Sequence, residues 1–223
     1  MIRPAKALPQ TDLLVVRSLG LREYAPLWHR MQRYTDNRSP QSADEIWFTE
    51  HPSVFTLGLN ASRDHLLSPG NIPVIQVDRG GQVTYHGPGQ LMIYPLIDLK
   101  RAGLGVRDMV TALEQTVVDL LAGLGIESAS RRDAPGVYVG GRKVASVGLR
   151  VRRGACYHGM ALNVDVDLEP FSRINPCGIS DLEVTDLRTI GVEESTAGIE
   201  GRVLRLLLGH LRMSERRVVR NRG

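Results

Sequence analysis

The sequence predicts an α+β domain with a mixed or antiparallel sheet and flanking helices. Strand-like and helix-like segments are grouped unevenly along the chain instead of alternating, which is typical of this class. The length of 223 residues is enough for one sizeable core. The composition, 42% hydrophobic but only 5% aromatic, indicates an aliphatic core. We expect a single catalytic domain over residues 1–213 and a basic, disordered tail over residues 214–223.

The first half of the chain predicts mainly short strands. Tyr24, Leu27, Trp28 and Met31 recur at helical spacing, so residues 22–33 predict a helix. Pro95 lies inside an apolar run over residues 90–99, and proline lacks the N–H that a central strand needs. That run therefore predicts a strand near the sheet edge. The other predicted elements are strands at 13–16, 45–50, 53–57 and 74–78 and a helical turn at 62–67.

The second half contains the clearest helix, over residues 106–124, with Gly125 as the expected C-cap. Its apolar residues fall on one face. Residues 136–139 and 143–151 predict a hairpin that turns at Gly140-Gly141. The remaining elements are a strand at 157–166, an irregular connection at 170–177 and a last helix at 198–213.

The charge distribution argues against nucleic acid as a partner. The net charge is +4, but seven arginines lie within residues 202–222, and the body is close to neutral without them. The N-terminus has no apolar signal core, no run of 18 apolar residues occurs, and the two cysteines lack metal-ligand spacing. We expect a cytoplasmic monomer with reduced thiols that binds neither membrane nor nucleic acid.

Three segments carry the chemistry. Residues 79–90 read RGGQVTYHGPGQ, which favours a loop that wraps a ligand. Lys143 lies in GRKVASVG at residues 141–148, and Cys177 lies in NPCG at residues 175–178. Taken singly, a cysteine is more often a small buried hydrophobe, and a lysine at a turn is usually a surface charge. His86 and His158, taken singly, favour a structural role, and no third ligand at metal spacing accompanies them.

Together, these segments and HGMALN at residues 158–163 resemble the octanoyltransferases of lipoate biosynthesis. The resemblance covers roughly residues 12–210. It implies the catalytic fold of biotin protein ligases and lipoate-protein ligases. It also implies transfer of an octanoyl or lipoyl group from acyl carrier protein to a lysine of lipoyl domains, through a cysteine thioester and without ATP or metal. The implied acceptors are the E2 subunits of 2-oxoacid dehydrogenases and the glycine cleavage H protein.

The resemblance also assigns roles to residues. Cys177 would be the nucleophile and Lys143 the residue that contacts its sulfur. A nearby ammonium stabilises a thiolate, and only the thiolate attacks well. Whether Lys143 also accepts a proton from the incoming amine stays open, and backbone N–H groups near Val147 and Gly148 are candidate oxyanion donors. The implied substrate-binding residues are Arg79, Gly80, Gly81, Gln82, Val83, Thr84, Tyr85, His86, Ala145, Ser146, Val147, Gly148, His158, Gly159 and Met160.

Four other functions compete with this one. A ligase of the same fold would need a phosphate-binding loop for ATP, and an amidotransferase between lipoyl domains would place its cysteine in a different loop. A nucleic-acid-binding module would leave Cys177 unexplained and would need aromatic stacking positions beside its basic residues. A cysteine hydrolase would admit water where this family admits an amine.

Overall fold

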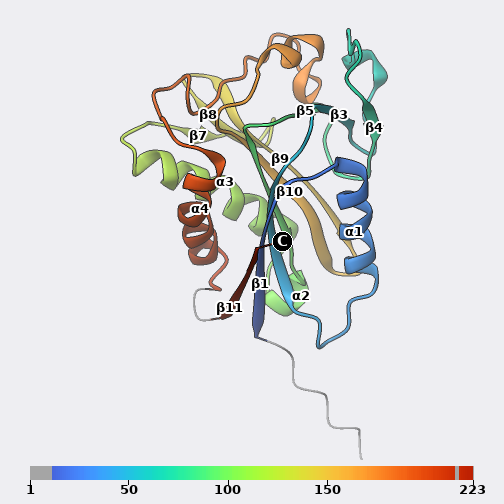
Figure 1. Ribbon diagram of the computed structural model, residues 1–223, viewed down its shortest axis with the longest axis vertical. Coiled ribbons are helices and arrows are strands. Elements are labelled where there is room, and N and C mark those ends of the chain that lie inside the picture. The colour runs from blue at the N-terminus through green and yellow to red at the C-terminus, as the bar shows by residue number, and fades with distance from the viewer. Residues whose placement is uncertain (1–11, 214–215, 223) are drawn as a thin grey trace, which may run out of the picture.

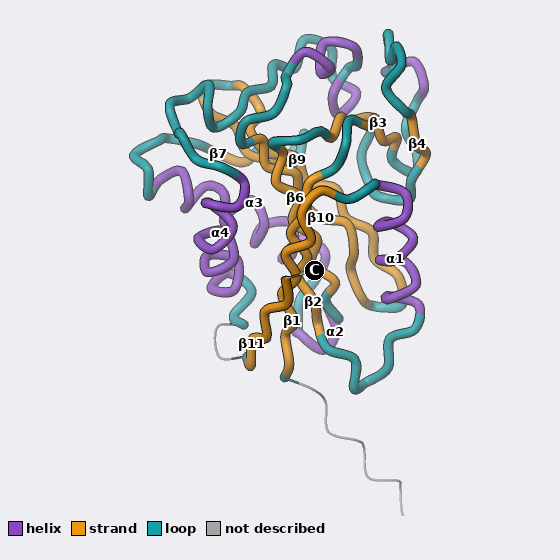
Figure 2. Tube along the Cα trace, in the orientation of Figure 1, coloured by secondary structure: helices purple, strands orange, loops and turns teal. Residues whose placement is uncertain are grey.

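The computed structural model describes residues 12–213 and 216–222 and has a mixed sheet covered by helices on both faces (Figure 1). Eight strands follow the order β11-β1-β2-β6-β10-β9-β8-β7. The pairs β1–β2 and β1–β11 are parallel, and the other pairs are antiparallel. The predicted α+β class with a mixed sheet is confirmed. A smaller sheet, β4-β3-β5, lies beyond one end of the large sheet (Figure 2).

The strands of the large sheet are β1 (Leu13–Leu21), β2 (Asp44–Glu50), β6 (Gln90–Leu96), β7 (Ala129–Ser130), β8 (Gly136–Val139), β9 (Arg142–Arg152), β10 (Ala155–Asn163) and β11 (Arg217–Arg222). Those of the small sheet are β3 (Val54–Leu57), β4 (Val74–Gln76) and β5 (Val83–His86). The helices are α1 (Tyr24–Asp36), α2 (Leu99–Ala102), α3 (Val106–Ala122), α4 (Thr196–His210) and the 3-10 turns η1 (Arg63–His65), η2 (Glu169–Arg173) and η3 (Pro176–Gly178).

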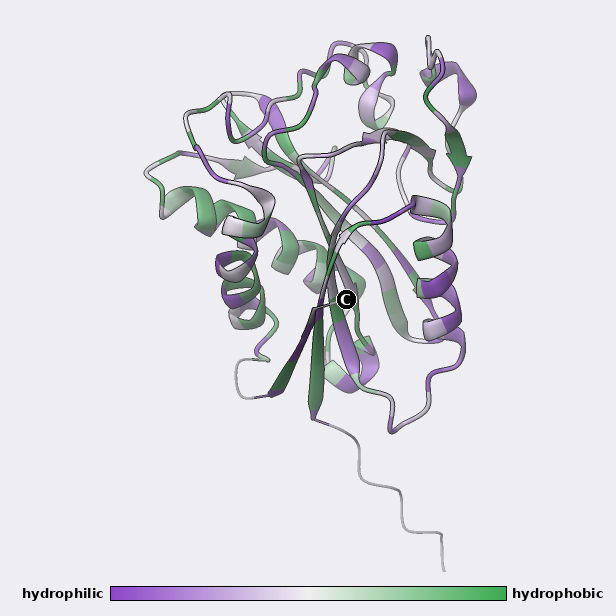
Figure 3. Cartoon of the chain, in the orientation of Figure 1, coloured by the Kyte–Doolittle hydropathy of each residue, from purple (hydrophilic) through white to green (hydrophobic). Residues whose placement is uncertain are grey.

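The core lies on both faces of the large sheet. Helices α3 and α4 pack together over one face, where α3 buries Met109, Leu113, Val117 and Leu121. Helix α1 covers the opposite face with Leu27 and Met31. In Figure 3 the hydrophobic colour follows the central strands and α3, whereas α1 mixes hydrophobic and hydrophilic residues. The helices predicted from periodicity therefore form where their apolar faces meet the sheet.

The hairpin prediction is confirmed. Strands β8 and β9 pair in antiparallel fashion around Gly140 (φ 55°) and Gly141 (φ 82°). Two consecutive residues with positive φ are what a type I′ turn requires, and glycine adopts them without strain.

The glycine-rich segment is not wholly a loop, which corrects the expectation for residues 79–90. Its middle forms β5, which pairs with β3, for example through Phe55 and Tyr85. The run Val-Thr-Tyr-His has the β-branched and aromatic residues that strands favour, and the surrounding glycines obscured it.

The expectation that Pro95 marks an edge strand is wrong, because β6 lies in the centre of the sheet between β2 and β10. Met160 pairs with Ile93, and the Cys156 N–H donates to the Ile97 carbonyl, so β10 passes Pro95 at His158. There His158 takes a left-handed conformation with φ 57°. The missing N–H of Pro95 is accommodated by this local irregularity in β10, so β6 keeps its neighbour on both sides.

Replacing Gly159 by alanine tests how tightly β10 approaches Pro95. A Cβ at Gly159 would collide with the Ile93 carbonyl and lie 2.7 Å from Pro95 Cδ. We expect the free energy of unfolding in urea to fall by about 1–3 kcal/mol. Gly201→Ala in α4 is the control, because its Cβ would meet nothing within 4 Å, and it should leave stability unchanged or slightly raised. Equal effects of the two changes would contradict the close approach.

The expected disordered tail is also corrected. Residues 217–222 form β11, which pairs in parallel with β1 from Leu13–Arg217 to Ser18–Arg222. An edge strand presents unpaired backbone groups, and Val218 and Val219 have the shape that strands favour, so the segment completes the sheet. Ser214, Glu215 and Gly223 lie outside the described residues.

Candidate functional site

The structure brings Lys143 and Cys177 into direct contact. Lys143 Nζ donates to Cys177 Sγ at 2.9 Å and to the Pro135 carbonyl oxygen at 3.0 Å. Its backbone is fixed as well, because its N–H donates to Glu183 O and its carbonyl accepts from Thr185 N–H. Lys143 is only 1% exposed, which is unusual for a lysine unless its charge is partnered. The buried Lys143 and the partly exposed Cys177 therefore form a thiol–amine pair.

Cys177 lies in η3, where the backbone turns sharply. Its φ is 58°, a left-handed conformation that is uncommon for a residue other than glycine and that recurs at functional sites. The turn is held because the Asn175 N–H donates to His65 O at 2.8 Å. Gly178 packs against Gln82 and His65, and a Cβ there would lie 3.0 Å from Gln82 Cγ. This packing places the partly exposed Cys177 beside the glycine-rich segment.

A second cation lies near the thiol. Arg79 is 7% exposed and interacts electrostatically with Cys177. Its guanidinium donates to Thr56 O at 2.7 Å and to Gly80 O at 2.9 Å, which fixes its position. Two cationic side chains, Lys143 and Arg79, therefore lie near Cys177.

A cavity of about 50 Å³ opens beside Cys177. Twelve of the predicted substrate-binding residues line it: Arg79, Gly81, Gln82, Val83, Thr84, His86, Ser146, Val147, Gly148, His158, Gly159 and Met160. Four further residues that the sequence did not single out also line it, and these are Tyr24, Met92, Tyr94 and Ala161. Tyr24 and Tyr94 are buried, so the cavity combines apolar walls with tyrosine, histidine and arginine side chains.

Three predicted binding residues do not line the cavity. Tyr85 packs against Phe55 and Phe171, because successive side chains of a strand point to opposite faces. Ala145 belongs to the main core, and the Gly80 N–H donates to Leu149 O at 2.9 Å. Gly80 therefore ties the glycine-rich segment to β9 and contributes no cavity wall.

Asp78, which the sequence did not single out, fixes the orientation of His158. Its carboxylate accepts bonds from His158 Nε2 at 2.9 Å, Trp28 Nε1 at 2.8 Å, Gln32 and Tyr157. Burial opposes ionisation of Asp78, but these bonds together outweigh it and hold the pKa of Asp78 well below its usual range. Burial lowers the pKa of His158, so its Nδ1 is left unprotonated and faces the Tyr24 hydroxyl at 3.5 Å.

Removing the Asp78 carboxylate should destabilise the fold in a pH-dependent way. We expect Asp78→Ala to lower the free energy of unfolding at pH 7 by roughly 2–4 kcal/mol, because several charge-assisted bonds are lost. A carboxylate with a depressed folded-state pKa stabilises the fold above its unfolded pKa of about 4 and loses that effect as the pH falls. The difference in free energy of unfolding between Asp78→Ala and wild type, measured in urea, should therefore become smaller as the pH is lowered from 5 to 3. Asp133→Ala, at an exposed ion pair with Arg131, should change little at either pH.

His86 is likewise held uncharged. Its Nδ1 contacts Gln90 Oε1 at 2.7 Å and its Nε2 contacts Thr56 Oγ1 at 3.2 Å. Burial lowers the pKa of His86 well below its usual range, and the nearby His51 and Arg79 lower it further. Both predicted histidines therefore contribute neutral walls to the cavity.

The two predicted oxyanion donors differ in direction. On the edge of β9 away from β10, Lys143 N–H donates to Glu183 O and Leu149 O accepts from Gly80 N–H. Backbone groups alternate between edges, so the Val147 N–H points to this same edge, where pairing with β8 has ended at Ser146. Gly148 pairs with Gly159 of β10 and points the other way. Of the two candidate oxyanion donors, the Val147 N–H is therefore the one that points away from β10.

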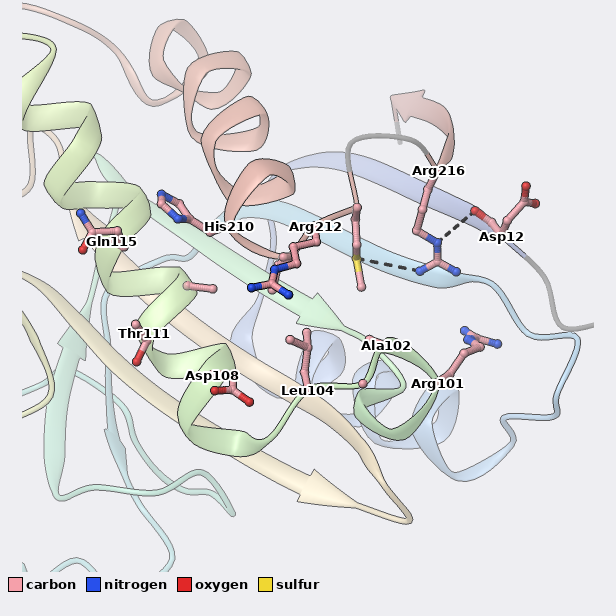
Figure 4. A pocket seen from close by; sticks show the side chains of 14 residues that line it. Asp12, Arg101, Ala102, Leu104, Asp108, Thr111, Gln115, His210, Arg212 and Arg216 are labelled. Carbon is pink, nitrogen blue, oxygen red and sulfur yellow. Dashed lines mark hydrogen bonds between the residues drawn. The ribbon is translucent and has the colours of Figure 1, made fainter.

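A larger cavity, of about 800 Å³, lies at the other end of the molecule and contains none of the predicted site residues (Figure 4). Its walls come from α2, α3, the end of α4 and the chain beside β11, and they include Arg101, Asp108, His210, Arg212 and Arg216. Within residues 12–213 and 216–222, no group of three or more His, Cys, Asp or Glu side chains is placed to hold a metal ion. No helix in this part of the chain has both the length and the apolar character that crossing a bilayer requires.

Solved structures share the fold at low sequence identity. Lipoate-protein ligase A bound with ATP superposes with a TM-score of 0.68 at 16% identity, covering 96% of this chain and 89% of that one. A bipartite lipoate protein ligase studied with its E2 lipoyl domain from Thermoplasma acidophilum gives 0.65 at 16% identity, covering 96% and 86%. Biotin protein ligase from Aquifex aeolicus, in complex with biotin and ATP, gives 0.52 at 13% identity, covering 90% and 70%. The fold expected from the resemblance is confirmed.

Sequence relatives are much closer. The octanoyltransferase of Alkalilimnicola ehrlichii is 64% identical over 184 residues, which are 82% of this chain and 85% of that protein. The octanoyltransferase of Pseudomonas savastanoi pv. phaseolicola is 53% identical over 205 residues, 92% of this chain and 94% of that protein. The family model of the lipoyl protein ligase A/B catalytic domain matches residues 23–205. The chain therefore belongs to the lipoyl protein ligase A/B catalytic domain family and, within it, to the octanoyltransferases, the acyltransferases of protein lipoylation.

Proposed function

We propose that this enzyme moves an octanoyl or lipoyl group from acyl carrier protein to a specific lysine of lipoyl domains through a thioester on Cys177. The observation that carries the proposal is the 2.9 Å contact between Lys143 Nζ and Cys177 Sγ, beside a cavity. The proposed acceptors are the lipoyl domains of 2-oxoacid dehydrogenase E2 subunits and the glycine cleavage H protein. The donor thioester is already activated, so the reaction needs neither ATP nor a metal ion.

In the first half-reaction the Cys177 thiolate attacks the carbonyl carbon of the donor thioester. The Val147 N–H stabilises the tetrahedral oxyanion. The bond to the pantetheine sulfur breaks, and the departing thiolate takes a proton from the Lys143 ammonium. The products are acyl-Cys177, a free pantetheine thiol and a neutral Lys143 amine.

In the second half-reaction the amine of the acceptor lysine attacks acyl-Cys177. The neutral Lys143 accepts the proton that the attacking nitrogen loses. The carbon–sulfur bond breaks and an amide is released. Cys177 returns as a thiolate beside the Lys143 ammonium, so protons balance over the cycle.

The cavity volume of about 50 Å³ is too small for a full octanoyl chain, so its walls must move apart when the acyl group enters. Met92 and Met160 line it, and methionine side chains adapt to irregular shapes. Each buried methylene contributes about 0.8 kcal/mol, which favours a chain over a short acyl group.

Intact-protein mass spectrometry tests this function. The enzyme is incubated with octanoyl-acyl carrier protein in the absence of ATP, and a mass increase of one octanoyl group is expected. The adduct should disappear with hydroxylamine and should pass to an added lipoyl domain. A requirement for ATP, or transfer to the lipoyl domain with no enzyme adduct, would contradict the proposal.

The apparent affinity of the enzyme for its acyl carrier protein donor should depend on salt concentration. The chain carries a net charge of +4, and acyl carrier proteins are typically acidic. We expect the apparent Michaelis constant for octanoyl-acyl carrier protein to rise with sodium chloride, because the Debye length falls to about 8 Å at 0.15 M. The uncharged thioester of octanoate with N-acetylcysteamine is the control and should show no such rise. A flat response for both donors would exclude electrostatic steering.

A further inference from the structure

A buried carboxylate that takes no part in the proposed steps lies behind Lys143. Glu114, on α3, is 9% exposed, and its Oε1 accepts the Gly136 N–H at 2.7 Å. On the other side, the Pro135 carbonyl oxygen accepts from Lys143 Nζ at 3.0 Å. Glu114 and Lys143 therefore contact the two ends of the peptide group that joins Pro135 to Gly136.

The geometry of this peptide group suits a link between the two charges. A trans peptide is planar, and its C=O and N–H point in opposite directions. Here the negative oxygen faces the Lys143 ammonium, and the positive N–H faces the Glu114 carboxylate. Hydrogen bonds in such a chain polarise one another, so the carboxylate strengthens the acceptor that the ammonium uses.

The peptide cannot easily turn away from this arrangement. Gly136 has φ 145°, which side-chain-bearing residues rarely adopt. A Cβ there would collide with the Ala145 carbonyl and lie 2.9 Å from Lys143 Cε. The preceding turn is also held, because the Tyr138 hydroxyl donates to Ala134 O at 2.7 Å.

Three further titratable or charged groups lie near Lys143 and are not carboxylates, and Glu183 contacts it through its backbone carbonyl. Cys177 contacts Nζ directly, and the Tyr138 ring centroid lies 5.3 Å from it. Arg131 lies 5.1 Å from the centroid of the same ring and is a further cation. Glu114 interacts electrostatically with Lys143.

Retaining a charge at this place has a cost. Burial raises the pKa of Glu114, against the opposing effects of the Gly136 bond and of Lys143. A neutral amide would satisfy the Gly136 N–H equally well and would avoid the desolvation of a carboxylate. Stability alone therefore does not account for a glutamate here.

We propose that Glu114 is a positioning residue that acts through the Pro135–Gly136 peptide to hold Lys143 Nζ against Cys177 Sγ. The proposal rests on the roles given to Lys143 and Cys177 in the proposed function. It adds to them a third residue, which touches neither the substrate nor the reacting sulfur.

The test is the rate of Cys177 alkylation by iodoacetamide against pH, followed by intact mass, in Glu114→Gln, Glu114→Asp and wild type. Glu114→Gln keeps the acceptor for Gly136 but loses the charge. We expect it to slow alkylation at pH 7 by about threefold to tenfold and to move the profile to higher pH, since the lost charge acted on Lys143 across one peptide. Its melting temperature should be unchanged or higher, and Glu114→Asp should restore part of the rate. In octanoyl transfer, kcat should fall in Glu114→Gln with KM unchanged.

Glu50→Gln is the matched control. Glu50 Oε2 accepts the Gly89 N–H of another Pro–Gly peptide at 2.7 Å, and its Oε1 accepts from the Thr196 hydroxyl. Within the described residues, no lysine side chain donates to the carbonyl of that peptide. This variant should keep the wild-type alkylation profile.

Two outcomes would overturn the proposal. One is a wild-type alkylation profile in Glu114→Gln, which would leave Glu114 as a plain acceptor for Gly136. The other is a lower melting temperature in Glu114→Gln, which would make the charge structural. Neither alkylation nor thermal unfolding needs an acyl donor. Both outcomes are therefore independent of whether the wild-type enzyme forms an octanoyl adduct.

Discussion

Replacing Cys177 by serine is expected to abolish the octanoyl adduct and to lower the rate of octanoyl transfer by at least roughly a thousandfold. A serine hydroxyl is a poor nucleophile near neutral pH unless a dedicated base removes its proton. In the proposed first half-reaction Lys143 is an ammonium and Arg79 stays charged, so neither can remove the proton of a serine hydroxyl. The measurement is intact mass after incubation with octanoyl-acyl carrier protein, with hydroxylamine to reverse a thioester.

Cys156→Ser is the matched control. Cys156 is fully buried in β10, and its Sγ donates to the Pro95 carbonyl at 3.3 Å. Burial raises the pKa of Cys156 to about 12, so its thiol stays protonated. Cys156→Ser should keep the adduct and change only stability. A hydroxylamine-sensitive adduct that survives in Cys177→Ser would disprove the assignment of the nucleophile.

Removing the Lys143 ammonium is expected to have the next largest effect. Lys143→Met keeps the length and apolar stem of the side chain, so it avoids the cavity that alanine would leave at a 1% exposed position. We expect alkylation of Cys177 at pH 7 and both acyl transfers to slow by roughly a hundredfold, because thiolate stabilisation and proton transfer are both lost. Single-turnover mass spectrometry separates the two transfers.

Arginine should not rescue this variant. A guanidinium is larger than an ammonium and does not deprotonate in proteins, so it cannot accept the proton of the incoming amine. Lys100→Ala, at an exposed position of α2, is the control and should behave as wild type. An alkylation profile unchanged by Lys143→Met would remove the lysine from this role.

The sequence predicts those parts of the fold whose causes are local. The apolar face of α3 and the turn at Gly140-Gly141 depend on neighbouring residues, and both appear as expected. The position of β6 depends on its partners, and Pro95 is misleading because β10 adapts to it. Residues 217–222 form a strand only because β1 offers an edge, and that edge lies about 200 residues away in sequence.

The candidate site likewise combines features that the local sequence predicts with features that only the tertiary fold produces. The segments that supply Lys143 and Cys177 are recognisable in the sequence, but their contact joins β9 to η3 and needs the tertiary fold. Tyr24 and Tyr94 fit the apolar pattern of a helix and a strand, so nothing local distinguishes them from core residues. Asp78 likewise stands alone in the sequence, and only folding brings Trp28, Tyr157 and His158 to its carboxylate.

The left-handed backbone of His158 has an evolutionary consequence. A mutation of Pro95 to a residue with an N–H would offer β10 a new ladder bond, and β10 could use it by returning to regular geometry at His158. That return would withdraw the imidazole from Asp78 and from the cavity. A substitution of Pro95 that makes the sheet more regular should thus lower the rate of octanoyl transfer. Pro95 and His158 should therefore covary among related sequences.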